Sequence, residues 1–439
     1  MYVKRRRAVT VLLALFTASR VVLFWVDREV YLEKFPYQDD APGYWQLARV
    51  WAGQGTYEQF GLSPFTRVPL YPLFLIPFLA PGGSLHLPAL FLVQQLMLLA
   101  VILGVFWYVY HRHGIRVGMT VAVTLTLFFD VTLYGFLVRS EALFTFLLFG
   151  AAAVLIQYWR RRQPVMLAGS GALFGLVALT RPVAFLVFIP ALPVIWAAAR
   201  REKTPLRRSV IFAGLFLTAF AAVLSPWLVR NWRLTGTFLL QQDTSNLIYA
   251  TYPGGHWQAF PVDQMFDATG KDALTVDRAL TALAVQRIAA HPSIWVRNSL
   301  HNFLFRLWAM GFTDTYLRYF DYASDRGAYQ KTSEGLLNRW AASLQLGSKQ
   351  FSISPLHHLY LIANNVLGFS LIFMVLLSLI AWPLLSTEGK IIESVLVYFW
   401  AITSVFAFSG SRYMVPLVPL LFMLLPDMFS RLRVRRLMG

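Results

Sequence analysis

The residue pattern best suited to chemistry in this chain is an adjacent pair of carboxylates followed by a short amphipathic stretch. Asp39 and Asp40 come soon after the first apolar run, and Tyr44, Leu47 and Ala48 follow at the spacing of a helix lying in a membrane interface. The surrounding sequence is mostly apolar and holds few acids, so we expect both carboxylates at a water-facing membrane boundary. A carboxylate placed there can take a proton from an acceptor while a lipid-borne donor loses its phosphate.

A structural role competes with this chemical one. Asp is favoured at the N-cap of a helix, and an interfacial helix is expected to begin at Pro42. One of the two acids can cap this helix while the other acts as a base. Both Asp39 and Asp40 therefore remain candidates for the catalytic carboxylate.

A group of arginines is expected on the same side of the membrane as the two acids. A guanidinium group can hold a phosphate through paired hydrogen bonds, so the group together predicts a clamp for a phosphate or pyrophosphate. Each of these arginines taken alone is also explained as an interface anchor that extends to the headgroup level. The four members are Arg67, Arg181, Arg230 and Arg412.

Further polar residues accompany these acids and arginines. Glu141 begins a predicted span, where a carboxylate is costly and usually functional, although a helix N-terminus also favours it. Tyr44 and Tyr413 are expected to support the site. His256 lies in a Gly-rich external loop and could ligate a divalent metal with Glu141 and Asp40, or be an ordinary polar loop residue. The requirement for a metal is left open.

The composition predicts a polytopic membrane protein built from helices. Of the 439 residues, 57% are hydrophobic, against roughly 45–50% in soluble domains. Several apolar runs reach about 18 residues, which is enough to cross the hydrocarbon core, and the alternation of a membrane β-barrel is missing. We expect a single all-α domain over residues 1–439 with about ten spans, at 8–26, 87–110, 117–136, 141–158, 165–181, 183–199, 209–228, 358–384, 391–408 and 412–429.

The net charge of +18 is explained by topology rather than by nucleic-acid binding. Basic clusters fall in short loops and at both termini, as in cytoplasmic loops of membrane proteins. We therefore expect a multi-pass protein of the cytoplasmic membrane with both termini in the cytoplasm and no nucleic-acid partner. Segments 27–86 and 230–355 are expected outside, with the proline-broken stretch 64–81 as a kinked interfacial or re-entrant piece rather than a span. The chain has no cysteine, no Walker A motif and no HExxH motif.

A set of short motifs occurs in a defined order along most of the chain. The ordered set resembles the GT-C glycosyltransferases, in the branch that includes protein O-mannosyltransferases and lipid A aminoarabinose transferases. The motifs are Asp40 to Ala48, Gly53-Gln54-Gly55, Arg67-Val68-Pro69-Leu70-Tyr71-Pro72, Ser140-Glu141, Leu179-Thr180-Arg181-Pro182, Pro226-Trp227 to Arg230-Asn231, and Arg412-Tyr413 with Pro416 and Pro419.

The resemblance implies transfer of a hexosyl or pentosyl group from a polyprenyl-phosphate carrier, on the outer face, with inversion. It implies that Asp40 acts as the base, with Asp39 as the close alternative. The acceptor is a glycan, a lipid or a protein. Two other functions share part of this logic: a flippase or transporter for lipid-linked sugars, and a polysaccharide polymerase or ligase. A transporter would line a path with its arginines, whereas here they are expected mostly at outer helix ends.

Overall fold

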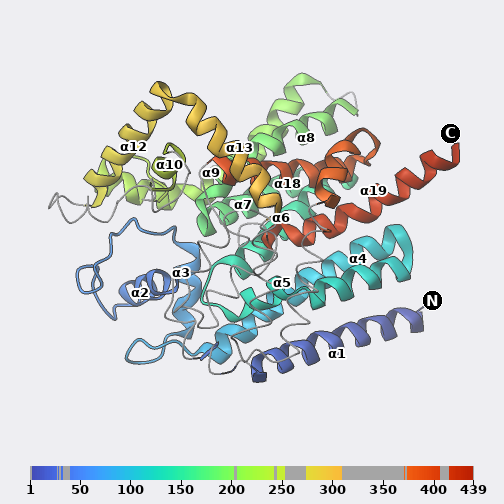
Figure 1. Cartoon of the computed structure of the whole chain (residues 1–439), viewed down its shortest axis with the longest axis horizontal. Helices are drawn as coiled ribbons and strands as arrows, with labels where there is room; N and C mark the ends of the chain where they lie inside the picture. The colour runs from blue at the N-terminus through green and yellow to red at the C-terminus, as the bar shows by residue number, and fades with distance from the viewer. Residues whose placement is uncertain are drawn as a thin grey trace, which may run out of the picture.

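A computed structural model describes most of the chain. The described residues are 2–26, 28, 31–32, 40–201, 205–241, 245–252, 273–308, 370, 373–405 and 415–438. Within them, all regular structure is helical apart from one isolated bridge between Leu79 and Leu85 (Figure 1). Several of the helices are long and apolar, so the predicted all-α class of membrane protein agrees with the structure.

The helices follow one another with few long connections. The α-helices are α1 (Tyr2–Val26), α2 (Ala41–Trp51), α3 (Leu70–Leu75), α4 (Leu87–Leu127), α5 (Phe129–Leu133), α6 (Glu141–Arg161), α7 (Pro164–Thr180), α8 (Phe188–Arg201), α9 (Leu206–Thr235), α10 (Ser245–Ala250), α12 (Ala273–Ala290), α13 (Pro292–Trp308), α18 (Thr387–Val405) and α19 (Val418–Met438). The short 3₁₀ helices are η3 (Ile76–Phe78), η4 (Tyr134–Phe136), η5 (Pro182–Ala184), η8 (Trp382–Leu384) and η10 (Val415–Leu417).

The expected number of about ten spanning helices is wrong for the described residues. Five helices there are long and apolar enough to cross a membrane: Arg5–Trp25, Leu87–Leu127, Glu141–Arg161, Leu206–Thr235 and Val415–Arg433. The apolar helices α7 and α8 are shorter, with 17 and 14 residues. Three charged residues early in α18, Glu388, Lys390 and Glu393, lower its apolar character. Most of the expected span 358–384 lies outside the described residues.

The expected span 87–110 and the first part of the expected span 117–136 lie in one element, α4, which has a sharp break. The rest of the second span forms α5 and η4. Gly114 has a φ of 84°, a conformation that costs little only for glycine, and it interrupts α4. Beyond it the chain turns back, which brings Gly118 against the backbone of Tyr110. Figure 1 shows the two arms of α4 lying side by side after this turn.

The proline-broken stretch 64–81 forms only short helices. Here α3 has six residues and η3 has three, so neither is long enough to cross a bilayer. Within the expected external segment 230–355, Pro292–Trp308 form α13, whose Phe303 packs against Trp400 of α18 with ring centroids 5.3 Å apart. This helix therefore contacts the helical bundle.

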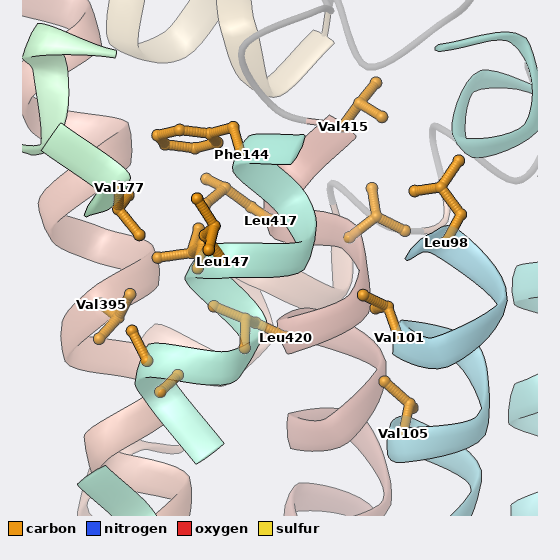
Figure 2. Close-up of a cluster of buried hydrophobic side chains, with 14 of the residues drawn as sticks. Leu98, Val101, Val105, Phe144, Leu147, Val177, Val395, Val415, Leu417 and Leu420 are labelled. Atoms are coloured by element: carbon orange, nitrogen blue, oxygen red, sulfur yellow. The ribbon is translucent and has the colours of Figure 1, made fainter. Parts of the chain in front are cut away.

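A buried apolar core joins the central helices. Figure 2 shows side chains of α4, α6, α7, α18, η10 and α19 meeting in one cluster, which includes Leu98, Val101, Val105, Phe144, Leu147, Val177, Val395, Val415, Leu417 and Leu420. Helices α7 and α9 approach one another closely at Gly171 and Gly175. A side chain at Gly171 would collide with the backbone of Phe216, and small residues four apart are a common contact between membrane helices.

The two ends of α6 mark the two ends of the bundle, about 30 Å apart for 21 residues. The end with Arg160 also carries the start of α1, because Arg5 lies 4.9 Å from the ring of Trp107 near the turn of α4. The start of α9 is there too, since Phe212 packs against Tyr158. The opposite end, which carries Glu141, is where the predicted chemical residues gather.

Candidate functional site

Asp40 and Arg67 form an ion pair at the Glu141 end of the bundle. Arg67 Nη2 lies 2.7 Å from Asp40 Oδ1, and the two side chains are 22% and 24% exposed. Asp40 occupies the N-cap position of α2, but its side chain makes no capping hydrogen bond. The capping role that competed for this acid is therefore not the one that the structure shows.

Helix α2 positions Asp40 at its start and carries the buried Tyr44 in its first turns. Pro42 lies in the first turn of α2, where its fixed φ suits a helix start and its missing N–H costs nothing. The predicted apolar face of this helix, Tyr44, Leu47 and Ala48, is buried. Burial of this face against α3 and the bundle fixes the end of α2 at which Asp40 lies.

Tyr44 is in contact on three sides. The Arg67 guanidinium lies 5.1 Å from the centre of its ring, and the ring of Tyr71 meets it edge-on at 5.0 Å. Its hydroxyl lies 3.4 Å from Ser140 Oγ. Tyr44 thus links the Asp40–Arg67 pair to the start of α6.

A second, more buried ion pair lies next to Ser140. Arg181 Nη2 is 2.5 Å from Glu141 Oε1, and the Glu141 side chain is 1% exposed. Arg181 Nε also donates to Ser140 Oγ at 3.0 Å. Glu141 begins α6 and Arg181 follows the last residue of α7, so the pair joins the ends of two neighbouring helices. The structure shows Arg181 held by Glu141 and Ser140, and its predicted role in donor binding stays a prediction.

Tyr71 lies beneath Tyr44 and is fully buried. Its hydroxyl donates to Gln94 Oε1 at 2.9 Å. Burial, followed by the negative charge of Glu141, holds the pKa of Tyr71 well above its usual value. Tyr71 therefore remains a neutral hydrogen-bond donor under the whole site.

Buried polar side chains of α1 and α4 hold the irregular segment that leads to Ser140. Gln94 Nε2 donates to the carbonyls of Gly135 and Leu137 at 3.2 and 2.9 Å. Gln95 Nε2 donates to Thr132 O at 3.0 Å. Arg20 Nη1 donates to Thr126 O at 2.5 Å, in the last turn of α4 just before this segment.

These hydrogen bonds matter because unpaired carbonyls are costly in a membrane interior, so non-helical backbone there needs protein donors. Our sequence interpretation missed these residues. Their signal was an adjacent pair of glutamines, Gln94 and Gln95, inside a long apolar run.

Arg230 anchors the segment that carries Arg67. Its Nη1 bonds Asn231 Oδ1 at 2.7 Å and Pro64 O at 3.4 Å, and its Nη2 lies 3.4 Å from Tyr57 Oη. Its guanidinium also lies 4.5 Å from the ring of Trp227. The structure thus attaches the 57–65 stretch to α9 through Arg230, and its predicted role in donor binding stays a prediction.

Four predicted site residues, Asp39, His256, Arg412 and Tyr413, lie outside the described residues. In the part of the chain that the structure describes, no three His, Asp or Glu side chains gather as a metal site. The carboxylate of Glu141, one of the predicted metal ligands, is instead paired with Arg181.

Comparisons of the chain with protein-family models, with curated proteins and with solved structures find no match. The chemistry of the site must therefore be argued from its own geometry. That geometry combines a partly exposed carboxylate fixed by an arginine with a buried ion pair that joins two helix ends.

Proposed function

We propose that the protein is an inverting glycosyltransferase that moves a sugar from a polyprenyl-phosphate carrier to an acceptor on the outer face of the cytoplasmic membrane. The observation that carries the proposal is the Asp40–Arg67 pair, a partly exposed acid and cation in contact at one end of a membrane-type helical bundle. The ordered motifs of the GT-C glycosyltransferases support the same activity.

Exposure distinguishes the two described acids of this site. The Asp40 side chain is 24% exposed, whereas that of Glu141 is 1% exposed and paired with Arg181. A general base must come within hydrogen-bond reach of the proton that it removes. An acceptor can approach the partly exposed Asp40 but not the buried Glu141, which supports Asp40 as the base.

The reaction needs a base on one side and charge stabilisation on the other. Asp40 takes the proton of the acceptor hydroxyl as its oxygen attacks the anomeric carbon of the sugar. The bond from that carbon to the phosphate oxygen breaks, and its electron pair leaves with the polyprenyl phosphate. Arg67, 22% exposed, is the cation that we propose stabilises the negative charge of that phosphate. Attack opposite the leaving phosphate inverts the anomeric configuration.

The arrangement of charge along the bundle supports the membrane orientation. The Arg160 end of the bundle also carries Arg5, Arg112 and the basic start of α9. Cytoplasmic ends of membrane proteins are enriched in Lys and Arg, which supports a cytoplasmic position for that end. In that orientation Asp40 would lie on the outer side, where a lipid-linked donor would present its sugar.

The test is a transfer assay with the full chain in liposomes. The probes are a radiolabelled polyprenyl-phosphate sugar and an acceptor extract of the cell envelope. We expect label to pass from the lipid to the acceptor fraction. Movement of label across the bilayer without transfer would instead identify a transporter of lipid-linked sugars and overturn the proposal.

A further inference from the structure

The side chain of Tyr44 separates the partly exposed ion pair from the buried one. The Arg67 guanidinium lies on one side of its ring at 5.1 Å, and its hydroxyl lies 3.4 Å from Ser140 Oγ. Ser140 Oγ in turn accepts the 3.0 Å hydrogen bond from Arg181 Nε. Tyr44 is itself buried beneath Arg67.

From this chain of contacts we infer that Tyr44 and Ser140 are positioning residues for the Asp40–Arg67 pair. The Tyr44 ring is a platform that holds the Arg67 guanidinium against Asp40. Ser140, held by Arg181, fixes the platform to the start of α6. This inference rests on the proposed transferase function, because Asp40 is positioned for that reaction.

The physical basis is the freedom of the arginine side chain. Arg67 follows an irregular stretch rather than a long helix, so its backbone alone does not fix the guanidinium. A cation on an aromatic face is attracted to it, and the attraction is stronger where water is excluded. Displacement of a catalytic group by about 1 Å can lower a rate about 10²-fold. A fixed platform therefore acts on turnover more than on donor binding.

The same contacts indicate how the Glu141–Arg181 pair acts within the site. Two of the Arg181 donors, Nη2 and Nε, are directed at Glu141 and Ser140. Glu141 itself is 1% exposed and lies away from water. The pair therefore holds Ser140 in place, and Tyr44 through it, and we infer that positioning is the role of Arg181.

The experiment separates the ring of Tyr44 from its hydroxyl. Tyr44→Phe keeps the platform, whereas Tyr44→Leu removes it. We expect kcat to fall by roughly 10–100-fold in Tyr44→Leu and by less than about 3-fold in Tyr44→Phe, with the KM for donor within about 2-fold of wild type in both. Ser140→Ala removes the contact with the Tyr44 hydroxyl, as Tyr44→Phe does, and also the bond from Arg181 Nε. It should therefore lower kcat somewhat more than Tyr44→Phe, by roughly 3–10-fold, and Ser140→Thr, which keeps the hydroxyl, should restore most of it.

A matched control is available away from the site. Tyr252 holds the Arg287 guanidinium at 3.7 Å from its ring, a contact of the same kind. Tyr252→Leu should leave kcat unchanged at equal protein folding. An equal fall of kcat in Tyr252→Leu and Tyr44→Leu would overturn the inference, because loss of any such contact would then produce the effect.

A second readout does not depend on activity. Reaction of Arg67 with phenylglyoxal, followed by mass spectrometry, measures how firmly its guanidinium is held. We expect faster labelling of Arg67 in Tyr44→Leu than in wild type or Tyr44→Phe. Equal labelling in all three proteins would overturn the positioning inference.

The two proposals fail in different ways. An active wild type with unchanged kcat in Tyr44→Leu would overturn the positioning inference and leave the transferase function standing. An inactive wild type with faster Arg67 labelling in Tyr44→Leu would overturn the function and leave Tyr44 as the support of the ion pair.

Discussion

The two ends of α6 carry ion-pair clusters made of the same residue types but with different exposure. At the Glu141 end, the Asp40–Arg67 pair is joined by a contact at 2.7 Å and remains partly exposed. At the Arg160 end, Glu388 is held by two arginines at once and its side chain is 10% exposed. The first arrangement leaves its carboxylate 24% exposed, and the second leaves only 10%.

We call the second group, Arg112, Arg160, Glu388, Asp427 and Arg431, the Glu388 cluster. Arg160 Nε and Nη2 bond the two oxygens of Glu388 at 2.9 and 2.7 Å, and Arg112 Nη2 lies 2.5 Å from Glu388 Oε1. Asp427 accepts a hydrogen bond from the backbone N–H of Ser386 at 2.9 Å. These contacts connect α4, α6, α18 and α19 at one end of the bundle.

Helix ends explain why the Glu388 cluster suits stability. Arg160 lies in the last turn of α6 and Glu388 in the first turn of α18. Each charge therefore interacts favourably with the dipole of its own helix. Planar pairing through two hydrogen bonds adds fixed geometry. The comparison teaches that carboxylate–arginine pairs alone do not mark a site. Exposure of the carboxylate distinguishes the Asp40–Arg67 pair from the Glu388 cluster.

The largest expected effect separates the two ends by turnover. Asp40→Asn keeps the size of the side chain but removes its charge, so transfer should fall by roughly 10²–10⁴-fold if Asp40 is the base. Donor binding should change little. The measurement is single-turnover transfer with purified protein of matched thermal stability.

The matched control for Asp40→Asn is Glu58→Gln, which removes an exposed acid from the same external segment. Its transfer should equal that of wild type. Asp39→Asn should be milder than Asp40→Asn. A normal rate in Asp40→Asn with an inactive Asp39→Asn would move the base to Asp39.

The next largest effect concerns the Glu141–Arg181 pair, which is the buried ion pair at the Glu141 end of the bundle. Arg181→Ala leaves the buried Glu141 without its counter-charge, which should lower the free energy of unfolding by about 3–5 kcal/mol. The double variant Arg181→Ala with Glu141→Gln should recover a large part of that loss. Thermal unfolding in detergent measures both. A stable Arg181→Ala protein that only binds donor more weakly would return Arg181 to the predicted phosphate clamp.

Glu388→Ala probes the opposite end. It leaves Arg112 and Arg160 without their shared carboxylate. We expect a loss of about 2–3 kcal/mol of stability, less than for a fully buried pair because the Arg160 side chain is 37% exposed. Transfer per folded molecule should not change. If turnover collapsed while the unfolding temperature stayed constant, the contrast between the two ends would be wrong.

The smallest expected effect concerns the support beneath the site. Gln94→Leu removes one partner from the Tyr71 hydroxyl and from the carbonyls of Gly135 and Leu137. We expect a loss of about 1–2 kcal/mol of stability. Unfolding temperatures would be compared with those of Gln157→Leu, a change at a half-buried position on α6. Equal effects of the two variants would show that these hydrogen bonds add nothing specific.

Some of the site was predictable from local patterns. Apolar composition indicated helices, and the positions of Asp40 and Tyr44 predicted a short amphipathic helix whose apolar face is buried. Arg67 and Arg181 were expected on the same face as the acids, and the structure brings both into one connected group with Glu141. These predictions succeed because helix periodicity and motif order are properties of neighbouring residues.

The number of long spans was not predictable from apolar runs alone. A hydropathy window measures composition and does not detect a backbone break. The positive φ at Gly114 is such a break, and it separates two apolar runs that belong to the same helical element, α4. It also does not measure where an apolar helix ends, so α7 and α8 were expected as spans although each is short.

The sequence by itself determined the helical class and which residues are candidates for chemistry, whereas tertiary structure decided the partner of each charge. Asp40 can cap a helix or pair with an arginine, and only the position of Arg67 selects the pair. Arg160 and Glu388 are 228 residues apart in sequence yet share two hydrogen bonds. The physical reason is that charge pairing and exposure depend on distance in space, which folding sets and local spacing does not.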